Sequence, residues 1–494
     1  MRSGLLRAKK SVIIGGGLAG ITAAIALASA GTDVTLLEAR PRLGGATTSF
    51  SRDGLAVDTG QHVFLRCCTA YRGLLDRLGM TAHAPLQPRF DVTVLSPRGP
   101  ARLRRAKAPA PLHLGPALAR YALLSYPERI KASAAALAFR SVDPADPEAD
   151  RIRLGDWMAA RGQDERARRA LWDLFTVATL NVPGDDASLA LAAKVVRTGL
   201  LADSGAADIG VPALPLGELH GAAAERKLAS LGASVRLNTK VTAIEAREPG
   251  FAVRLARGGE VIEADAVVLA VPHEAAAKLI PPGALPGATV SGWSGLGAAP
   301  IVNVHVSYDR KVMDLPFAAA VDSPVQWVFD RTRISGLHAR GGSGQYLAVS
   351  LSAADEYVDQ PVAELRERFV PALAEVLPAA REARVTEFFV TRERRATFRQ
   401  VPGTARLRPP AATGLPGLVL AGSWTDTGWP DTMESAVRSG LNAVLALRQA
   451  GVGPASEAVP VPQAAPVSQA APAAALIGTN GLISISGPVP HPRE

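Results

Sequence analysis

A glycine-rich turn near the start of the chain has the spacing of a dinucleotide-binding motif. Gly15, Gly17 and Gly20 fit the pattern GxGxxG, and Leu18 and Ala19 lie within it. The first glycine permits a tight turn, the second lets backbone N–H groups approach a pyrophosphate, and the third lets a helix pack closely on a strand. We therefore expect these residues to hold the phosphates of a dinucleotide cofactor.

The residues around this turn complete a strand–helix–strand unit. The β-branched run 10–14 predicts a buried parallel strand, 21–30 predicts an Ala-rich helix ending at Gly31, and 33–38 predicts a second strand. Glu38 closes that strand, where a carboxylate accepts hydrogen bonds from ribose hydroxyls and repels a phosphorylated ribose. With strand, helix and acid in these places, a turn that binds nothing is the weaker interpretation.

The segment after Glu38 resembles the extended fingerprint of the FAD-dependent amine oxidase and phytoene desaturase superfamily. The acid is followed four positions later by Arg42 and then by Gly44 and Gly45. In that superfamily these positions run beside the FAD diphosphate and ribityl chain, and a cation with bare backbone suits a dianionic group. The resemblance implies that Glu38, Ala39, Arg42, Gly44 and Gly45 bind FAD.

A late segment resembles the strand, loop and helix that close the FAD site in the same superfamily. The apolar run 415–422 is followed by a helical block, 431–440, with acids near its start. The resemblance implies four FAD contacts here: Gly422, Ser423, Thr432 and Met433. Many relatives carry Asp or Glu where this chain has Ser423, so the usual anionic contact is missing or comes from Asp426. The segment has no cysteine, so we expect the FAD to be non-covalent.

Two central pieces complete the pattern. The run 232–244 predicts a strand pair, and 264–272 predicts a strand that ends in Ala-Val-Pro. In the superfamily the residue matching Val241 bonds the adenine through its backbone. Gly60, which ends an Asp-x-Gly pattern typical of the superfamily, and Gln61, which follows it, are also assigned to FAD.

The expected fold class is α/β (α+β), with a glutathione-reductase-like, Rossmann-type FAD-binding domain interleaved with a mixed-sheet and helical substrate domain. The first insertion looks helical, including a helix pair in 160–182, and the second has period-2 strands at 300–307, 345–350 and 385–391. The expected parts are FAD-binding segments 8–80, 231–275 and 415–451, a helical, membrane-facing segment 81–230, a second substrate segment 276–414, and a disordered Pro/Ala-rich tail 452–494.

Composition excludes several classes of protein. Of the 494 residues 48% are hydrophobic and 20% charged, an ordinary globular balance. The two cysteines, Cys67 and Cys68, are adjacent, which excludes a disulfide scaffold and CxxC-type metal sites and fits a reducing compartment. We expect a cytoplasmic protein with no metal, no nucleic-acid partner and no transmembrane helix.

Positive charge is concentrated in one segment. Residues 81–140 contain ten Lys or Arg against two acids, and four of these bases cluster just before the apolar stretch 112–126. The clustered bases are Arg102, Arg104, Arg105 and Lys107. A basic cluster beside an amphipathic helix fits contact with anionic headgroups at the inner face of the membrane, and a solvated face beside a core helix is the alternative.

Two motifs resemble the squalene-associated FAD-dependent desaturase group, whose characterised members are hydroxysqualene dehydroxylases. They are the Asp-x-Gly-Gln-His pattern within 57–71 and the string AGSWTDTGWP at 421–430. The resemblance spans about 10–450 and implies that an apolar isoprenoid loses an allylic hydroxyl as water before hydride from reduced flavin yields squalene. The alternative is a carotenoid desaturase or amine oxidase using the scaffold oxidatively. A non-catalytic carrier is disfavoured because the FAD glycines are intact.

The implied reaction needs an acid at the leaving hydroxyl and aromatic faces that tolerate a cation. His62, beside the expected flavin edge, is the first expected acid, and Asp426 is the second, with a raised pKa if it is buried. Trp424 and Trp429 are expected as walls of the substrate pocket. A structural histidine and core-packed tryptophans are the alternatives. The one dinucleotide fingerprint is assigned to FAD, so the electron donor is not identified.

Overall fold

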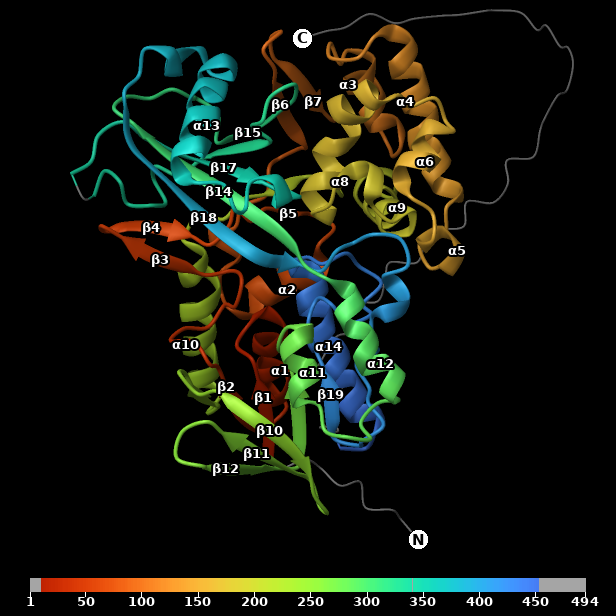
Figure 1. Cartoon of the computed structure of the whole chain (residues 1–494), viewed down its shortest axis with the longest axis vertical. Coiled ribbons are helices and arrows are strands. Elements are labelled where there is room, and N and C mark those ends of the chain that lie inside the picture. Colours follow the sequence, from red (N-terminus) through yellow and green to blue (C-terminus); the bar gives the residue numbers. More distant parts are fainter. Residues whose placement is uncertain (1–9, 340, 453–494) are drawn as a thin grey trace, which may run out of the picture. The chain divides into compact units, whose positions relative to one another are not determined.

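The glycine-rich turn follows the central strand of a five-stranded parallel sheet (Figure 1). The computed structural model describes residues 10–339 and 341–452, and the predicted tail lies outside them except for Val452. The sheet order is β19 (Leu418–Leu420), β13 (Ala266–Leu269), β1 (Lys10–Ile14), β2 (Asp33–Leu37) and β9 (Ser234–Arg236). Three separate parts of the sequence therefore build this one sheet.

Helices α1 (Leu18–Ser29) and α14 (Met433–Gln449) cover one face of the parallel sheet. They approach closely at Gly440, where a Cβ would lie 2.4 Å from the carbonyl oxygen of Ala19. The predictions of β1, α1 and β2 are confirmed, and Gly31 has the expected positive φ of 81° after the helix. The strand predicted at 415–422 is shorter, because only Leu418–Leu420 pairs with β13.

The two strands predicted in 232–244 are present, but they do not pair with each other. β9 joins the parallel sheet, whereas β10 (Val241–Ala246) begins a separate antiparallel sheet with β11 (Phe251–Leu255) and β12 (Val261–Ala264). This small sheet packs under the parallel sheet, on the face opposite α1 and α14. Alternation of apolar residues predicts a strand but carries no information about its distant partner.

A second large sheet is mixed and has seven strands. Its order is β18 (Val385–Thr397), β14 (Ala299–Tyr308), β17 (Gln345–Leu351), β16 (Trp327–Asp330), β15 (Phe317–Ala320), β6 (Asp91–Leu95) and β7 (Ala101–Arg104). The three strands predicted in the second insertion are confirmed as β14, β17 and β18. Because β6 and β7 come from the first insertion, both insertions build this sheet. Helix α13 (Val362–Val376) covers one face, and the opposite face carries Asn303 and His305.

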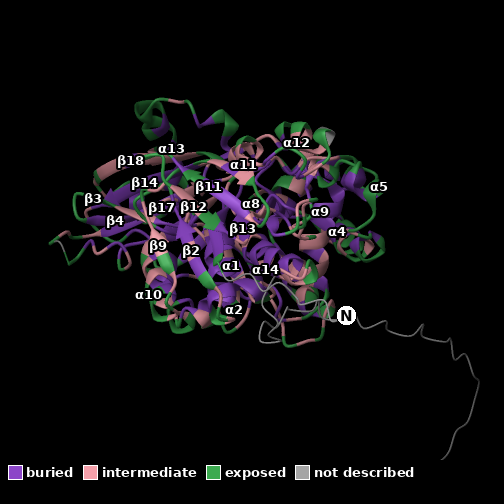
Figure 2. Ribbon diagram, turned by 90° about the horizontal axis from the view of Figure 1, so that it is seen from below, coloured by how far each residue is buried: buried purple, intermediate pink, exposed green. Residues whose placement is uncertain are grey.

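The first insertion also supplies the helices that lie beside this sheet. They include α3 (Gly115–Ala119), α4 (Tyr126–Ala138), α5 (Pro147–Asp150), α6 (Leu154–Ala159), α7 (Glu165–Ala167), η4 (Arg168–Trp172), α8 (Asp173–Leu180), α9 (Leu189–Val196) and η6 (Arg197–Leu201). The helix pair predicted in 160–182 is wrong, because α7, the π-helical turn η4 and α8 follow one another without a break. Their apolar side chains form a large buried core (Figure 2).

The expected amphipathic helix at 112–126 is also wrong. The stretch forms a short 3-10 turn and α3, and a new helix, α4, begins at Tyr126. Ser125 and Glu128 form a capping box at that start, with Pro127 in the first turn. These two signals fix a helix N-terminus at the point where the prediction placed a helix end.

Shorter elements connect the layers. They are β3 (Ser49–Arg52), β4 (Leu55–Asp58), β5 (Phe64–Leu65), α2 (Thr69–Arg77), β8 (Ile209–Gly210), α10 (Ala223–Ser230), α11 (His273–Leu279) and α12 (Gly287–Gly292). The segment between β4 and β5 contains the Gly60–His62 motif and lies against β14, since the Asn303 amide donates to the Thr59 carbonyl at 3.4 Å.

Candidate functional site

The glycine-rich turn is held by the acid predicted to bind ribose. One carboxylate oxygen of Glu38 accepts from the Gly16 N–H at 2.6 Å, and the other accepts from the Arg40 N–H at 2.7 Å. Gly15 has a φ of 109°, and a Cβ on Gly20 would lie 1.9 Å from the Gly15 carbonyl oxygen. Only glycine fits at both positions, as the motif predicts.

The second glycine pair lies directly against this turn. The Gly44 N–H donates to the Gly16 carbonyl at 2.8 Å, and a Cβ on Gly45 would lie 2.9 Å from the Cα of Gly17. Both glycines have positive φ, 111° and 60°. The structure thus brings together two motifs that the sequence separates. Ala39 and Arg42 are exposed beside them.

These residues fit an FAD diphosphate. Gly17 is the N-cap of helix α1, which has no side-chain cap and no acid in its first turn, so its N–H groups and its positive dipole end favour an anion. A Cβ on Gly17 would meet its nearest atom only at 3.9 Å, which leaves room for a ligand. The buried Thr48 hydroxyl, beside Gly44, has no hydrogen-bond partner among the described residues. The glycines and α1 would hold the diphosphate, and Glu38 lies where the ribose is expected.

The late segment forms a tight loop before α14. Gly422 has a φ of 140°, and a Cβ there would lie 2.4 Å from the Trp424 indole nitrogen. That indole donates to the Val271 carbonyl at 3.0 Å, and the ring packs at 4.8 Å on Trp293 in the core beneath the parallel sheet. Trp424 therefore occupies the position of a core residue, which was the alternative to a pocket wall.

Trp429 is half-buried and lies between elements distant in sequence. Its ring centroid is 5.1 Å from Lys194 Nζ on α9 and 4.9 Å from the Arg438 guanidinium on α14. Both contacts are cation–π interactions. Lys194 was missed by sequence reasoning because helical periodicity does not indicate which distant ring a lysine faces. Burial and the neighbouring Arg438 lower its pKa.

Two aspartates in this loop have different environments. Asp426, the predicted second acid, is exposed, so the burial on which that prediction depends is absent. Burial raises the pKa of Asp431, although the Ser423 hydroxyl and the Phe398 N–H donate to its carboxylate. Ser423 therefore uses its hydroxyl to hold a nearby acid. No spacing signal distinguished Asp431 from the other acid of the loop.

Helix α14 starts beside these residues. Thr432 is its N-cap and accepts from the Ser435 N–H at 3.3 Å, and Met433 is its first residue. The buried Glu434 carboxylate accepts from the backbone N–H groups of Ala70 and Tyr71 at 3.1 and 2.8 Å. This carboxylate fixes α2, and with it the Gly60–Cys68 segment, against the N-terminus of α14.

His62 is held in one tautomer. Its Nδ1 lies 3.1 Å from the Gly60 carbonyl oxygen, which can only accept, so Nδ1 carries the proton. Burial lowers the pKa of His62, although the Gly60 hydrogen bond and the Asp58 carboxylate oppose this effect. The ring is therefore neutral at pH 7 and presents Nε2 as an acceptor. The role of His62 as an acid stays a prediction.

A buried ion pair fixes the start of this segment. Asp58, at the end of β4, pairs with Arg331, which follows β16, and both side chains are buried. Asp58 also accepts from the Ser49 hydroxyl at 2.6 Å and from the Leu216 N–H at 3.0 Å. Sequence reasoning missed this pair, because its members are 273 residues apart.

The helices of the first insertion enclose an apolar cavity of about 220 Å³. Its walls include Phe90, Leu114, Leu118, Leu171, Phe175 and Leu200. Among the described residues no charged side chain lines it, and Ser133 supplies its one hydroxyl. The arrangement suits a hydrocarbon chain.

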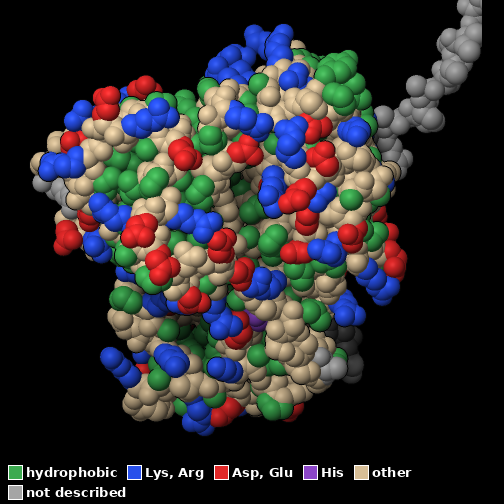
Figure 3. Space-filling view, turned by 45° about the horizontal axis from the view of Figure 1, so that its top comes forward, with side chains coloured by type: hydrophobic (Ala, Val, Ile, Leu, Met, Phe, Trp, Pro, Cys, Tyr) green, Lys and Arg blue, Asp and Glu red, His purple; other side chains and the backbone are tan. Residues whose placement is uncertain are grey.

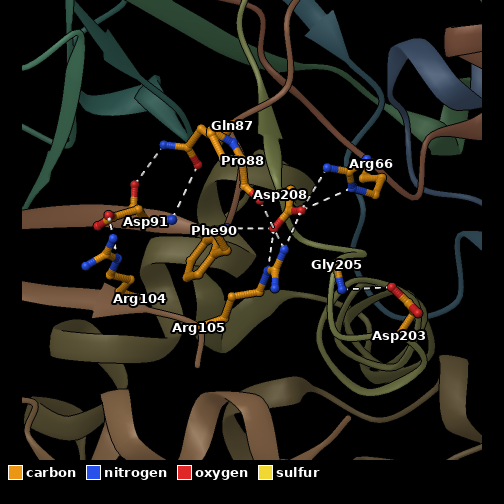
Figure 4. Close-up of polar contacts among 10 residues, drawn as sticks. All are labelled: Arg66, Gln87, Pro88, Phe90, Asp91, Arg104, Arg105, Asp203, Gly205 and Asp208. Atoms are coloured by element: carbon orange, nitrogen blue, oxygen red, sulfur yellow. Dashed lines mark hydrogen bonds and ion pairs between the residues drawn. The ribbon is translucent and has the colours of Figure 1, made fainter. Parts of the chain in front are cut away.

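The basic segment near this cavity is largely paired with acids. Lys and Arg side chains lie close to hydrophobic ones at the top of the view in Figure 3, with acids among them. Figure 4 shows Asp208, which is fully buried, between Arg66 and Arg105, while Arg104 reaches Asp91. Arg102 pairs with the same Asp91 at 2.6 Å. Of the four clustered bases, only Lys107 has no ion pair within the described part of the chain.

The Asp208 carboxylate accepts hydrogen bonds both from a residue that lines the cavity and from a residue close in sequence to His62. It accepts from the Phe90 N–H at 2.6 Å, from Arg105 Nε at 2.7 Å and from Arg66 Nη2 at 3.0 Å. Burial alone would raise the pKa of Asp208, but these hydrogen bonds lower it below its ordinary value. Phe90 lines the cavity, and Arg66 lies four residues after His62.

Two classes of feature are absent from the described residues 10–339 and 341–452. They contain no cluster of His, Cys, Asp or Glu suited to a metal ion. None of their helices is both long enough and apolar enough to cross a bilayer.

Comparison with known proteins agrees with this geometry. The model of the flavin containing amine oxidoreductase family matches residues 18–447. The chain is 28% identical to a hydroxysqualene dehydroxylase of Rhodopseudomonas palustris, over 89% of this chain and 98% of the relative. It is 25% identical to a 15-cis-phytoene desaturase of Glycine max, over 89% and 79% of the two chains. A solved putrescine oxidase has the same fold, with a TM-score of 0.65, 20% identity and coverage of 90% and 98%.

The family match extends from the start of α1 almost to the end of α14 and so includes Gly20, Gly44, Gly45 and Gly422, whereas Gly15 and Gly17 precede it. The mixed α/β fold predicted from the sequence is confirmed by the solved structures. The chain therefore belongs to the flavin-containing amine oxidoreductase family, and it is an FAD-dependent oxidoreductase.

Proposed function

We propose that this oxidoreductase reductively removes the allylic hydroxyl of hydroxysqualene or a closely related isoprenoid. The observation that carries the proposal is the apolar cavity between α3, α4, η4, α8 and η6. Burying a hydrocarbon chain gains about 0.8 kcal/mol per CH₂, so such a wall favours an isoprenoid. The relative named hydroxysqualene dehydroxylase supports the choice, because the match covers 98% of its length.

The cavity also distinguishes this proposal from amine oxidation. A cationic amine is stabilised by a carboxylate or by polar acceptors, and no charged side chain lines the cavity among the described residues. The relatives named phytoene desaturases favour a second candidate, the oxidative desaturation of a carotenoid. A carotenoid would suit the same apolar wall, so the two candidates differ in chemistry rather than in the type of pocket.

Bound FAD, when reduced, supplies the hydride for the carbon that loses the hydroxyl. The protein's own task is to place that carbon and to protonate the leaving oxygen. We propose that His62 supplies the proton in its imidazolium form, because the Gly60 carbonyl holds Nδ1 and leaves Nε2 without a hydrogen-bond partner among the described residues. The half-buried Trp429 ring, already in contact with two cations, is the proposed aromatic face for positive charge on the substrate.

The test is anaerobic incubation of the FAD-loaded protein with hydroxysqualene and dithionite. We expect squalene, identified by mass spectrometry, with one molecule formed per flavin in a single turnover. Conversion should increase as the pH falls below 7, because a lowered pKa of His62 leaves little imidazolium at neutral pH. Desaturation of phytoene without any squalene formation would favour the second candidate and remove the first.

The partner surface proposed for this enzyme is an anionic membrane. Helix α4 presents an exposed stripe of Tyr126, Ile130 and Leu137, which are 72%, 55% and 48% exposed. Lys131 on the same helix is exposed and has no ion pair among the described residues, so the helix combines exposed apolar area with positive charge. Leu137 also lines the cavity, which places the apolar stripe beside the wall proposed for the substrate.

Flotation with vesicles of anionic lipid tests this surface. The double variant I130S/L137S should lose most of its vesicle binding and keep its FAD. Val362→Ser is the matched control, since Val362 is an exposed apolar residue (42%) on α13. Equal flotation of both variants would remove α4 as the contact. The proposed location is the cytoplasmic face of that membrane.

A further inference from the structure

Asn303 carries a buried oxygen that no described residue satisfies. The residue lies on β14 and is 0% exposed. Its Nδ2 donates to the Thr59 carbonyl oxygen at 3.4 Å. Because that carbonyl can only accept, the nitrogen and not the oxygen of the amide must face Thr59. Oδ1 is therefore directed elsewhere and has no hydrogen-bond partner in the described chain.

Two more acceptors belong to the residues that follow Gly60 in the chain. A Cβ built on Gly60 would lie 3.2 Å from His62 Cε1 and 3.9 Å from Asn303 Nδ2, so both side chains flank Gly60. His62 directs its protonated Nδ1 to the Gly60 carbonyl, which leaves Nε2 as an acceptor. The next residue, Gln61, has a buried Oε1 that is unpartnered in the described part of the chain.

The three groups have one hydrogen-bonding character in common. Each offers a lone pair, and one Asn303 Nδ2 proton and the His62 Nδ1 proton are already donated to the Thr59 and Gly60 carbonyls. Buried polar groups in proteins are almost always hydrogen-bonded, and an isolated acceptor is costly to bury. An acceptor without a partner is complementary to an O–H or N–H group. A purely apolar group would leave all of them unsatisfied.

We infer that Asn303, with Gln61 and His62, forms an acceptor site that positions one hydrogen-bond donor at the Gly60 segment. That donor is either the hydroxyl of the substrate or a ring N–H of the bound flavin. The first possibility rests on the proposed function, and the second does not. In both cases Asn303 orients a reacting partner and does not itself exchange a proton.

The experiment compares Asn303→Leu with Ser307→Ala in the FAD-loaded protein. Ser307 lies on the same face of β14, and its hydroxyl is also buried and unpartnered in the described part of the chain, so it controls for the loss of a polar atom. Two quantities are measured: the midpoint potential and absorption spectrum of the flavin without substrate, and the dissociation constants of hydroxysqualene and squalene.

If the substrate hydroxyl is the donor, Asn303→Leu should reduce the preference for hydroxysqualene over squalene by about tenfold, the size of one lost buried hydrogen bond. If a flavin N–H is the donor, the midpoint potential and the spectrum should shift, and the preference should not. Ser307→Ala should change neither quantity. Either result supports the site and identifies its ligand.

Wild-type values of both quantities in Asn303→Leu would overturn the inference. Should that variant fail to retain FAD, Gln61→Leu measures the second acceptor in the same two assays, and Asn303→Asp keeps an acceptor oxygen in the original shape. Unchanged values in Gln61→Leu would then also overturn it. A wild-type protein that does not convert hydroxysqualene refutes the proposed function alone, because the flavin potential is measured without substrate.

Discussion

The nucleotide-binding turn and the helical layer around the cavity are constrained in opposite ways. At the turn the decisive contacts join backbone atoms, and an added Cβ would lie 1.9 to 2.9 Å from them at Gly20 and Gly45. Around the cavity the contacts join apolar side chains, which can repack. Because these backbone contacts leave no room for an added atom, the turn requires glycine at particular positions. The helical layer requires only a total apolar volume and a few buried ion pairs.

Substitution of a motif glycine should produce the largest effect. In Gly20→Ala the new Cβ would meet the Gly15 carbonyl oxygen at 1.9 Å, so α1 must move away from the turn that receives the diphosphate. We expect purified Gly20→Ala to lack FAD, measured by absorbance near the flavin maximum and by the FAD released on denaturation. Gly73→Ala on α2 is the control, because a Cβ there meets nothing within 4 Å. A Gly20→Ala protein that keeps FAD would contradict the comparison.

Loss of the buried carboxylate in the helical layer should be the next largest effect. Asp208→Asn leaves Arg66 and Arg105 without their anion, and breaking a buried pair costs about 4 kcal/mol. We expect a lower thermal midpoint with FAD still bound, measured by differential scanning calorimetry of the holoprotein.

The control for this variant is Asp91→Asn, which removes a more exposed partner of Arg102 and Arg104. Exposed pairs contribute about 0–1 kcal/mol, so its midpoint should hardly change. Equal shifts in the two variants would show that burial of Asp208 is not what matters.

Sequence patterns found the turn because its constraints are local. Glu38, Gly44 and Gly45 lie within 30 residues of Gly15, and the positive φ angles of Gly44 and Gly45 favour glycine there. The helical layer escaped prediction because its determinants are distant. Asp208 meets Arg105 across 103 residues and Arg66 across 142. Periodicity indicated helices there but did not show that η4 is a π-helical turn inside a single helix.

The same argument explains the outcome at the candidate site. His62 and Trp429 were found because they lie in motifs of the chain. Asn303 and Arg331 were missed because they come from β14 and from the loop after β16, whose sequences look like ordinary sheet. The charge count of 81–140 was also incomplete, since Asp208 and Asp322 lie outside the segment and neutralise Arg105 and Arg98.

A smaller effect, on the pH dependence of stability, is expected from Asp173 in the helical layer. Burial and the nearby Asp185 raise its pKa to about 6, against Arg168 and Arg169 and a Thr176 hydrogen bond that lower it. A carboxyl whose folded pKa is raised binds more protons when folded, so its contribution to stability is full below about pH 4. That contribution is lost as the pH rises to 6.

Asp173→Asn removes this titration. The variant should be more stable than wild type at pH 7, by up to about 3 kcal/mol, and equally stable near pH 4. Thermal midpoints of the two holoproteins, measured from pH 4 to 7, should therefore diverge as the pH rises. Parallel curves would show that burial in the helical layer does not raise the pKa of Asp173.

The smallest effect is expected on vesicle binding, and it tests whether one exposed lysine or the total charge of residues 81–140 attracts the membrane. Lys131 on α4 is exposed and has no ion pair among the described residues, whereas Arg102 shares Asp91 with Arg104. A basic residue at an anionic surface contributes about 1 kcal/mol, so Lys131→Gln should weaken vesicle binding about fivefold at low salt. Arg102→Gln removes the same unit of charge and should weaken it less, because Arg102 is held on Asp91. Equal weakening would mean that the membrane responds to the field of the whole segment. The apolar stripe of α4 would then not be the surface that binds the membrane.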